Sequence, residues 1–483
     1  MKIERIMMIR PGTRYSYIGF AQPLGFLYMI SLLRRDFPGR FEIDLVEQAL
    51  YNLSFEQIRN RMKEFEPDMV CISAMSVEQK EAAEVARISK ELAPSRPVIL
   101  GGPHATIFYD RVLKDTMVDV AVIGEGERTF LEILSRFENN EPLDDVKGIA
   151  FMRDGNMVVT PDREFIENLD SIPLPAWDMV DFKRYSRETS MNAFCHSTPW
   201  AILFTTRACP FHCAYCHNIF GKKIRKRSVE NVIEEIEILT GRYGVKELHI
   251  VDDIFNLDLP RAKRICDEIV ERGIKVKIAF PNGLRGDMMD RELIKKLKAA
   301  GCYTITYAVE TASPRLQKAI KKNLNLDKVK QAIVWTDEEG IIPQAFFMLG
   351  FPCETPEEIE STIRYAFDSK LLRPWFFTVV VYPRTGLLDL ARKAYPDFDF
   401  SGWDEFDFDY WAENSLYGKA TGVDLFKVQR RAYVRFFLRP RIVLKILWRF
   451  PKNRFMFRGI YWGIRWIFVV PFRLEKMIRE LSR

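Results

Sequence analysis

Three cysteines lie within eight consecutive residues of a chain of 483 residues. They are Cys209, Cys213 and Cys216 in the segment FTTRACPFHCAYCHN, and their spacing is CxxxCxxC. Three thiolates on one tight loop can bind three irons of a cubane 4Fe-4S cluster and leave the fourth iron open for chemistry. The alternative is part of a structural zinc site, with His212 or His217 as a further ligand. The spacing favours the cluster.

The other five cysteines are scattered along the chain. They are Cys71, Cys195, Cys266, Cys302 and Cys353. So few cysteines in so long a chain do not make a disulfide scaffold, and we interpret these five as small buried residues. Cys353 alone stands near a predicted site loop, where a catalytic role is the alternative.

A regular alternation of apolar runs and helical patterns surrounds the cysteine loop. The apolar runs predict six strands, at residues 201–206, 246–251, 276–281, 303–309, 343–349 and 375–381. Six βα units predict a partial (β/α)6 barrel similar to a TIM barrel, whose reactive groups gather at the C-terminal ends of the strands. The residues at these ends are Asp252, Asp253, Asn282, Arg285, Glu310 and Gly350. A carboxylate at such a position can also be a simple helix cap.

The cysteine loop, with Tyr215 before its last cysteine, resembles that of the radical S-adenosylmethionine (SAM) superfamily, and the resemblance covers about residues 200–394. It implies that SAM chelates the open iron through its amino and carboxylate groups, and that one-electron reduction cleaves SAM to a 5′-deoxyadenosyl radical. An electron donor such as flavodoxin or ferredoxin is then expected. The cofactor-binding residues implied are Tyr215, Asp252, Asp253, Asn282, Arg285, Glu310 and Gly350.

The first third of the chain predicts a second α/β domain. Its apolar runs predict strands at residues 4–10, 41–47, 68–74, 97–102 and 118–124, separated by helical patterns. Right-handed crossovers then give a parallel, Rossmann-like sheet with ligand-binding loops at the carboxyl ends of its strands. The loops at these ends are ISAM (72–75), GGPHAT (101–106) and GEGE (124–127).

These loops resemble the cobalamin-binding domains that are fused to radical SAM modules. The resemblance implies that the corrin lies against Gly25, Ser73, Met75, Gly102, His104, Gly124, Glu125, Gly126 and Glu127, since glycines let the backbone approach a large flat ligand. The sequence lacks a DxHxxG motif, so base-off binding without a histidine ligand is expected. His104 as an axial ligand is one alternative, and a domain that binds nothing is another.

The chain is predicted to have four segments. They are a cobalamin-binding-like Rossmann domain (1–137), a connector with a hairpin (138–196), a radical SAM core (197–395) and an aromatic, basic helical region (396–483). The hairpin is indicated by Asp154 and Gly155, and the boundary by the prolines of SIPLPAWD.

The end of the chain is strongly basic. Residues 427–483 hold 16 Lys and Arg but only two Glu, whereas the whole chain has a net charge of +6. The best apolar run, 459–472, contains Arg465 and is too short to span a bilayer. We expect this region to lie on an anionic membrane surface, with packing on the barrel as the alternative. No nucleic-acid partner is expected, because no RNA-binding module is recognisable.

Together these features predict a cobalamin-dependent radical SAM methyltransferase that acts on an unactivated carbon of a hydrophobic, lipid- or isoprenoid-like small molecule. A non-methylating anaerobic oxidase or cyclase is the first alternative, and a non-enzymatic iron-sulfur or cobalamin-binding regulator is the second. Because the N-terminus shows no secretory signal, the enzyme is expected to be cytoplasmic and peripheral on the inner membrane face.

Overall fold

The computed structural model describes residues 2–12, 19–192, 195–217, 219–400 and 415–468. The chain forms two compact units. The first comprises Met1–Glu188, Arg207–Pro210 and Asn218–Asn231, and the second comprises Thr189–Thr206, Phe211–His217 and Val232–Arg483.

A seven-stranded sheet forms the centre of the first unit, in the order β2-β1-β3-β4-β5-β6-β7. The first five strands are parallel, and β6 and β7 form an antiparallel hairpin next to β5. The strands are β1 (Arg5–Arg10), β2 (Glu42–Glu47), β3 (Met69–Ser73), β4 (Val98–Gly101), β5 (Val120–Val122), β6 (Ile149–Arg153) and β7 (Asn156–Val159). The parallel part confirms the predicted Rossmann-like fold.

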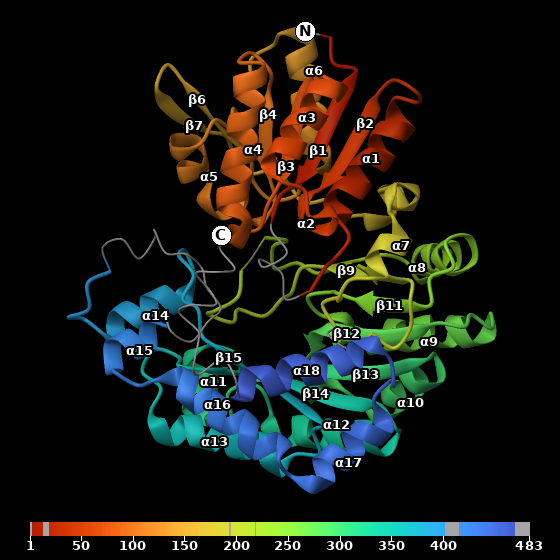
Figure 1. Ribbon diagram of the computed structural model, residues 1–483, viewed down its shortest axis with the longest axis vertical. Coiled ribbons are helices and arrows are strands. Elements are labelled where there is room, and N and C mark those ends of the chain that lie inside the picture. Colours follow the sequence, from red (N-terminus) through yellow and green to blue (C-terminus); the bar gives the residue numbers. More distant parts are fainter. Residues whose placement is uncertain (1, 13–18, 193–194, 218, 401–414, 469–483) are drawn as a thin grey trace. The chain divides into compact units, whose positions relative to one another are not determined.

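Helices cover both faces of this sheet (Figure 1). Alternate residues of a strand point to opposite faces, and in β1 Ile6 and Met8 join one buried cluster while Met7 and Ile9 join the other. The first cluster is completed by α1 (Leu24–Asp36) and α6 (Glu127–Asn139). The second is completed by α3 (Phe55–Phe65), α4 (Gln79–Leu92) and α5 (Pro103–Asp115). Burial on both faces explains why these strands are almost continuously apolar.

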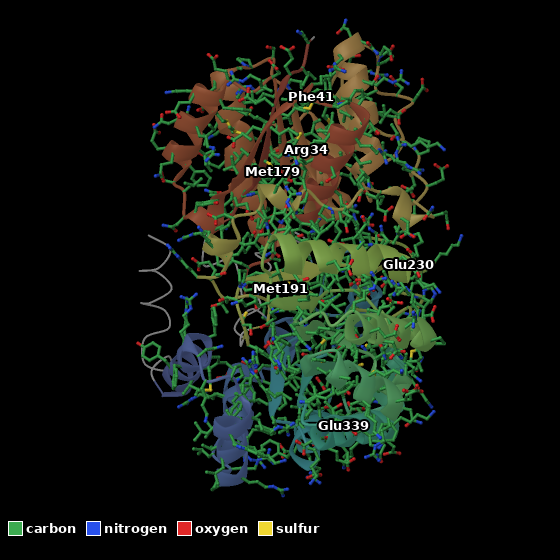
Figure 2. All side chains as sticks on the ribbon, turned by 90° about the vertical axis from the view of Figure 1, so that its right-hand side faces the viewer. Arg34, Phe41, Met179, Met191, Glu230 and Glu339 are labelled. Atoms are coloured by element: carbon green, nitrogen blue, oxygen red, sulfur yellow. The ribbon has the colours of Figure 1, made fainter. Side chains whose placement is uncertain are left out.

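The hairpin differs from the predicted connector, because β6 pairs with β5 and so extends the first sheet. Asp154 and Gly155 form its turn, both with positive φ, as an Asp-Gly hairpin requires. The segment that follows packs back on α1, where Arg34 donates hydrogen bonds to Asp178 and to the sulfur of Met179 (Figure 2). Short helices α2 (Gln48–Tyr51) and α7 (Phe182–Tyr185) complete this unit.

Six parallel strands form the centre of the second unit, in the order β15-β14-β13-β12-β11-β8. The strands are β8 (Trp200–Leu203), β11 (Glu247–Ile250), β12 (Lys277–Leu284), β13 (Cys302–Glu310), β14 (Ile342–Leu349) and β15 (Arg373–Thr378). Chain order and spatial order agree, as expected for successive βα units. A separate two-stranded ladder joins β9 (Thr206–Arg207) and β10 (Arg225–Lys226), and of these residues Arg207 and β10 belong to the first unit. The six parallel strands confirm the predicted α/β core.

Helices connect these strands and begin where the sequence offers a cap. At α13, Thr355 and Glu358 form a reciprocal capping box, and at α10 Asp290 accepts a hydrogen bond from Leu293 N. The connecting helices are α8 (Val229–Glu237), α9 (Leu259–Glu271), α10 (Arg291–Ala299), α11 (Pro314–Ala319), α12 (Leu326–Glu338) and α13 (Pro356–Asp368).

The C-terminal region is helical, as predicted. After α14 (Gly386–Ala394), which lies in the predicted core, its described helices are α15 (Leu416–Thr421), α16 (Leu425–Phe437), α17 (Pro440–Arg449) and α18 (Arg454–Phe468). The alternative that this region packs on the barrel describes α16. The hydroxyl of Tyr433 in this helix accepts a hydrogen bond from the backbone N of Phe376 in β15 at 2.8 Å. The acidic, aromatic residues 401–414 and the last residues, 469–483, lie outside the described part of the chain.

Candidate functional site

The predicted cluster cysteines follow β8 directly. Cys216 is exposed and Cys209 and Cys213 are partly exposed, whereas four of the other five cysteines are buried. The backbone between the last two is fixed, because Ala214 N donates to Ile320 O at 2.8 Å and Ala214 O accepts from Leu387 N at 2.9 Å. Cys216 N also donates to Cys213 O at 3.1 Å. The loop thus combines accessible sulfurs with an anchored backbone, which suits the assembly of a cluster.

The side chain of Asp252, predicted to contact a cofactor, contacts Thr205. Its carboxylate is buried and accepts hydrogen bonds from Thr205 N at 2.6 Å and from Thr205 Oγ1 at 2.5 Å. Burial raises the pKa of Asp252, and the bonds from Thr205 oppose that shift. Arg261 donates to the carbonyl of the same threonine at 3.0 Å. Asp252 therefore positions the strand end that leads into the cysteine loop, and the neighbouring Asp253 is partly exposed.

The end of β12 is also connected to the cysteine loop. The Arg285 guanidinium lies 3.9 Å from the ring centroid of Phe211, and its Nη2 donates to Lys322 O at 3.1 Å. Asn282 is exposed and donates to the carbonyls of Val251 and Asp252 at 3.2 and 3.1 Å. Both predicted residues thus lie at the carboxyl edge of the sheet.

Tyr215 and Glu310 meet at this edge as well. The Tyr215 hydroxyl donates to Glu310 Oε1 at 3.3 Å, and Lys322 Nζ lies 3.4 Å from the same oxygen. Burial and the nearby Glu310 raise the pKa of Tyr215 well above its ordinary value, so the phenol remains a donor. Glu310 has a φ of 69°, a left-handed conformation that a non-glycine residue adopts at some cost. Lys322 was not predicted from the sequence, because it lies in a helix-end segment without a motif.

Gly350 ends β14 with a φ of 88°, and a Cβ atom there would lie 2.4 Å from Leu425 Cδ1. The buried Glu354 accepts hydrogen bonds from Gly350 N at 2.6 Å and Phe351 N at 2.9 Å. Burial raises the pKa of Glu354 to about 8 despite these two bonds. Gly350 therefore shapes the turn after β14, and its positive φ favours glycine there.

In the first unit, the predicted loops lie at one edge of the sheet. The strand order β2-β1-β3 places a topological switch point between β1 and β3, where open α/β sheets bind ligands. Gly25 follows β1 and Met75 follows β3, and Met75 is 42% exposed. A Cβ atom on Gly25 or Gly124 would meet no described atom within 4 Å. Among the described residues, this edge therefore has open space next to Gly25 and Gly124, as a flat ligand needs.

The glycine loops are joined to one another by hydrogen bonds. His104 N donates to Ala74 O at 3.1 Å, and Thr106 Oγ1 accepts from Gly124 N at 3.1 Å. Gly102 has a φ of 91°, and a Cβ atom there would lie 2.9 Å from Ala74 O and 3.1 Å from Ser73 Oγ. The loops after β3, β4 and β5 thus form one surface that a larger residue at position 102 would disrupt.

His104 is almost fully buried beside Phe108, with its ring 5.5 Å from that of Phe108. Burial, with a smaller contribution from Arg111, lowers the pKa of His104 to about 4, so the ring is neutral near pH 7. Its Nδ1 is buried without a hydrogen-bond partner in the described structure. A neutral imidazole with one unsatisfied nitrogen suits a hydrogen bond to an amide-bearing ligand.

Glu125 and Glu127, on either side of Gly126, do not face such a ligand. Arg207 Nη2 lies 2.6 Å from Glu127 Oε1, and both Arg207 and Arg225 pair with Glu125, at 3.1 and 2.7 Å. All four side chains are buried. Burial lowers the pKa of Arg207, but Glu127 and Glu125 together raise it above its ordinary value. The predicted contact of these two carboxylates with a corrin is thus replaced by a buried ion-pair network.

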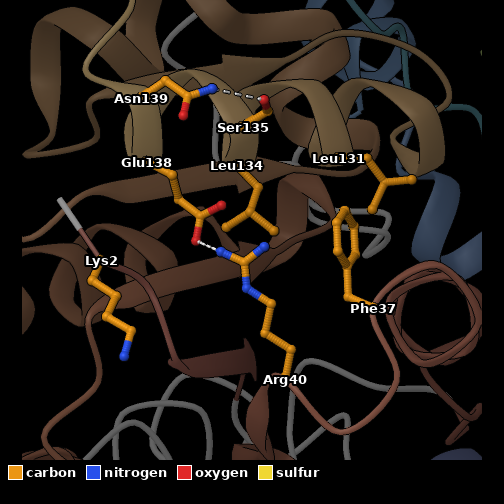
Figure 3. Close-up of a pocket in the computed structure, with 8 residues that line it drawn as sticks. All are labelled: Lys2, Phe37, Arg40, Leu131, Leu134, Ser135, Glu138 and Asn139. Carbon is orange, nitrogen blue, oxygen red and sulfur yellow. Dashed lines mark hydrogen bonds and ion pairs between the residues drawn. The ribbon is translucent and has the colours of Figure 1, made fainter.

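A surface pocket of about 510 Å³ lies elsewhere on the first unit (Figure 3). Lys2, Phe37 and Leu131 line it, together with the ion pair of Arg40 and Glu138. Lys2 precedes β1, so this pocket is at the amino end of that strand, away from the glycine loops at the carboxyl ends. It has no part in the site described here.

Comparisons with known proteins agree with these two sites. The family model of the radical SAM superfamily matches residues 203–366, and that of the B12 binding domain matches residues 16–134. An uncharacterized methyltransferase of Pyrococcus horikoshii is 30% identical over 454 residues, which cover 92% of this chain and 95% of the relative. The cytidylyl-2-hydroxyethylphosphonate methyltransferase of Streptomyces wedmorensis is 28% identical over 82% of this chain and 83% of its own.

The fold is also similar to a solved structure, the radical SAM methyltransferase TsrM from Kitasatospora setae with cobalamin and a [4Fe-4S] cluster bound. The TM-score is 0.65 at 18% identity, over 80% of this chain and 74% of TsrM. The two family matches assign three cofactors, namely a 4Fe-4S cluster, SAM and cobalamin. The accessible cysteine loop and the open glycine edge fit the cluster and the corrin. The chain belongs to the radical SAM enzymes that carry a B12-binding domain, a family whose named relatives include these methyltransferases and also an anaerobic magnesium-protoporphyrin IX monomethyl ester cyclase of Cereibacter sphaeroides, which is 28% identical over 82% of this chain and 65% of its own.

Proposed function

We propose that this enzyme transfers a methyl group to an unactivated carbon of a hydrophobic small molecule. The observation that carries the proposal is the combination, in one chain, of an anchored loop of three accessible cysteines with a glycine-lined sheet edge suited to cobalamin. When bound, SAM and the cluster supply reductive radical chemistry, and cobalamin supplies a methyl group. An electron donor such as flavodoxin or ferredoxin is part of the proposal.

The chain's own residues hold and orient these groups. Cys209, Cys213 and Cys216 would bind the cluster, and Asp252 fixes the strand end in front of them through Thr205. The protonated Tyr215 hydroxyl and the Lys322 ammonium both face Glu310, so that this carboxylate keeps one orientation at the strand end.

A row of aromatic side chains supports a hydrophobic substrate. Phe346, Trp375 and Phe377 are half-buried on one face of β14 and β15, and the Trp375 and Phe377 rings are stacked with centroids 6.0 Å apart. The opposite face is the one that the helices cover, since the fully buried Phe347 packs against Tyr365 of α13. Half-buried aromatic rings on the face turned away from the helices suit an apolar ligand with a few polar groups. We call Phe346, Trp375 and Phe377 the aromatic wall.

The test uses SAM with a deuterated methyl group in an anaerobic extract of cells that lack the enzyme. We expect the reconstituted enzyme to transfer deuterium label to a species that partitions into organic solvent. Trp375→Ala should lower this transfer about tenfold or more, because it removes a large contact surface for the substrate, while SAM cleavage without substrate continues. Trp335→Ala, on the outer helix α12, is the matched control and should retain transfer.

Label recovered only in polar products would refute the hydrophobic substrate. Formation of 5′-deoxyadenosine together with an unlabelled, oxidised or cyclised product would instead support the non-methylating alternative. Equal label transfer by wild type and Trp375→Ala would remove the aromatic wall from the proposal.

We also propose that α17 contacts an anionic membrane surface. Leu444, Leu447 and Trp448 are exposed on one side of this helix, with Trp448 79% exposed. The helix is held from its other side, where Lys445 Nζ lies 3.0 Å from Asp337 of α12 and Arg449 pairs with the same carboxylate. Exposed arginines such as Arg441 and Arg454 lie nearby in the sequence. An apolar face bordered by cations is typical of helices that lie in the membrane interface. Among the described residues, no helix is long and apolar enough to cross a bilayer.

Flotation with vesicles of phosphatidylcholine and phosphatidylglycerol tests this surface. We expect Trp448→Glu to lower the bound fraction about tenfold, since it removes roughly 1.5–3 kcal/mol of apolar burial and adds a repelled charge. Val270→Glu changes the charge equally at an exposed apolar position on α9 and should leave binding unchanged. Equal flotation of wild type and Trp448→Glu would contradict the proposal.

A further inference from the structure

A compact group of polar side chains lies buried at the amino ends of β8 and β11. Its members are Cys195, Glu247 and His249, and each has 0% of its surface exposed. One ligand atom from each, the sulfur, a ring nitrogen and a carboxylate oxygen, lies within 4.8 Å of the other two. Glu247 and His249 are two residues apart on β11, so both side chains leave the same face of the sheet. We call these three residues the buried triad.

Glu247 is held in one orientation by three hydrogen bonds. Its Oε1 lies 2.7 Å from His249 Nε2 and accepts from the Tyr303 hydroxyl at 2.7 Å, while its Oε2 accepts from Ser197 N at 2.6 Å. These contacts fix the direction of the carboxylate, and an Asp or Glu oxygen is a usual ligand of Zn²⁺.

His249 is fixed but incompletely satisfied. Its ring stacks on that of Trp200 at 5.3 Å between centroids. One nitrogen faces Glu247, and the other, Nδ1, is buried without a hydrogen-bond partner in the described structure. A buried ring nitrogen without a hydrogen-bond partner can act as a metal ligand.

Cys195 differs from the other buried cysteines of this unit in its polar surroundings. Cys302 makes only a weak contact with Thr304 O at 3.5 Å, whereas Cys195 Sγ lies 2.8 Å from Ser190 Oγ and within reach of the other two members of the triad. From the sequence, Cys195 was interpreted only as a small buried residue. That interpretation does not explain the polar side chains around its sulfur.

We propose that the buried triad binds one divalent transition metal ion, with Zn²⁺ as the occupant that best matches one thiolate, one imidazole and one carboxylate. At the usual Zn–S and Zn–N distances, of about 2.3 and 2.0 Å, ligand atoms lie roughly 3.5 Å apart, so small side-chain rotations close the site. A hydroxyl of Ser190 or Tyr303 can complete the tetrahedron.

The role of this ion is structural. It ties the segment before β8 to β11, and Asn453, at the start of α18, donates a hydrogen bond to the carbonyl of Cys195 at 2.6 Å. Glu247 starts β11 whereas Asp252 follows its end, which at about 3.3 Å per residue separates the buried triad from the cysteine-loop edge by roughly 16 Å. The metal is therefore distinct from the cluster.

The experiment uses the full-length, cluster-loaded enzyme, to which one equivalent of Zn²⁺ is added before gel filtration. We expect about one zinc ion per chain by mass spectrometry, counted separately from iron, and an X-ray absorption spectrum with one sulfur and two or three N/O ligands. Cys195→Ser combined with His249→Gln should lose the zinc, and Cys302→Ser, a change at a buried cysteine outside the triad, should retain it.

The absorption spectrum keeps the test decisive even if the double variant does not fold. Zinc bound in the cysteine loop would show three sulfur ligands, which would overturn the proposal. Enzyme that retains no zinc after gel filtration would overturn it too, as would a folded double variant that retains zinc at the wild-type level.

Discussion

Replacing Cys209 by alanine is expected to abolish reductive cleavage of SAM, with a loss of roughly a thousandfold or more. Three thiolates are needed to hold a 4Fe-4S cluster whose fourth iron is open. With only two thiolates, a second iron has no protein ligand and the cluster is not held. The backbone of the loop should survive, since its anchor is the bonding of Ala214 to Ile320 and Leu387, and not the sulfur of Cys209. The loss should therefore be chemical and not a loss of fold.

The measurements are iron content after anaerobic reconstitution and formation of 5′-deoxyadenosine in the presence of reductant. Cys353→Ser serves as the control, because Cys353 is also exposed but lies outside the loop. This variant should keep both readouts, and an equal loss in it would revive the catalytic role that the sequence left open. Undiminished SAM cleavage by Cys209→Ala would refute the assignment of the cluster.

Replacing Arg207 by methionine is expected to destabilise the first unit by about 3–5 kcal/mol, because it leaves the buried carboxylate of Glu127 without its partner and Glu125 with only Arg225. Removing one partner of a buried pair costs more than the pair itself contributes, since the remaining charge stays out of water. For a unit of this size, the loss corresponds to a fall of about 10 °C in the midpoint of thermal unfolding.

The control is Lys147→Ala, which removes an exposed ion pair with Glu164 and should cost less than about 1 kcal/mol. The combination of Arg207→Met with Glu125→Gln and Glu127→Gln should recover most of the loss, because no uncompensated charge remains. The measurement is the midpoint of thermal unfolding, by calorimetry at one pH, of wild type, Arg207→Met, Lys147→Ala and the triple variant. A midpoint for Arg207→Met within about 2 °C of wild type, the size of a surface effect, would show that the network is not stabilising.

The sequence predicts the first sheet well because its parallel strands are buried on both faces and are therefore almost continuously apolar. β1 is an example, with Ile6 to Ile9 all buried. In the second sheet, most of β14 is also a continuous apolar run, although Phe346 and Met348 are only half-buried. Loops that follow such strands must gather at one edge, so positions such as Gly102 and Glu310 could be placed there without coordinates. The cysteine spacing is likewise a local property.

Roles that depend on distant partners could not be predicted. Glu127 looks the same in the sequence whether it faces a ligand or Arg207, which is 80 residues away. Asp252 was predicted to bind a cofactor, and its two oxygens instead hold Thr205, 47 residues earlier. The hairpin turn was predicted from Asp154 and Gly155, but its pairing with β5 depends on how the sheet closes.

The network around Arg207 also has a consequence for how this protein can be divided or fused. The first unit ends its continuous stretch at Glu188, which looks like a natural place to cut, yet Arg207 and Arg225 are supplied by two later stretches of the chain. A fragment that stops at residue 188 would bury Glu125 and Glu127 without any counter-ion. The cobalamin-binding part therefore cannot be exchanged by cutting the chain after residue 188. A chimera with another radical enzyme must take residues 1 to about 231 from the same protein.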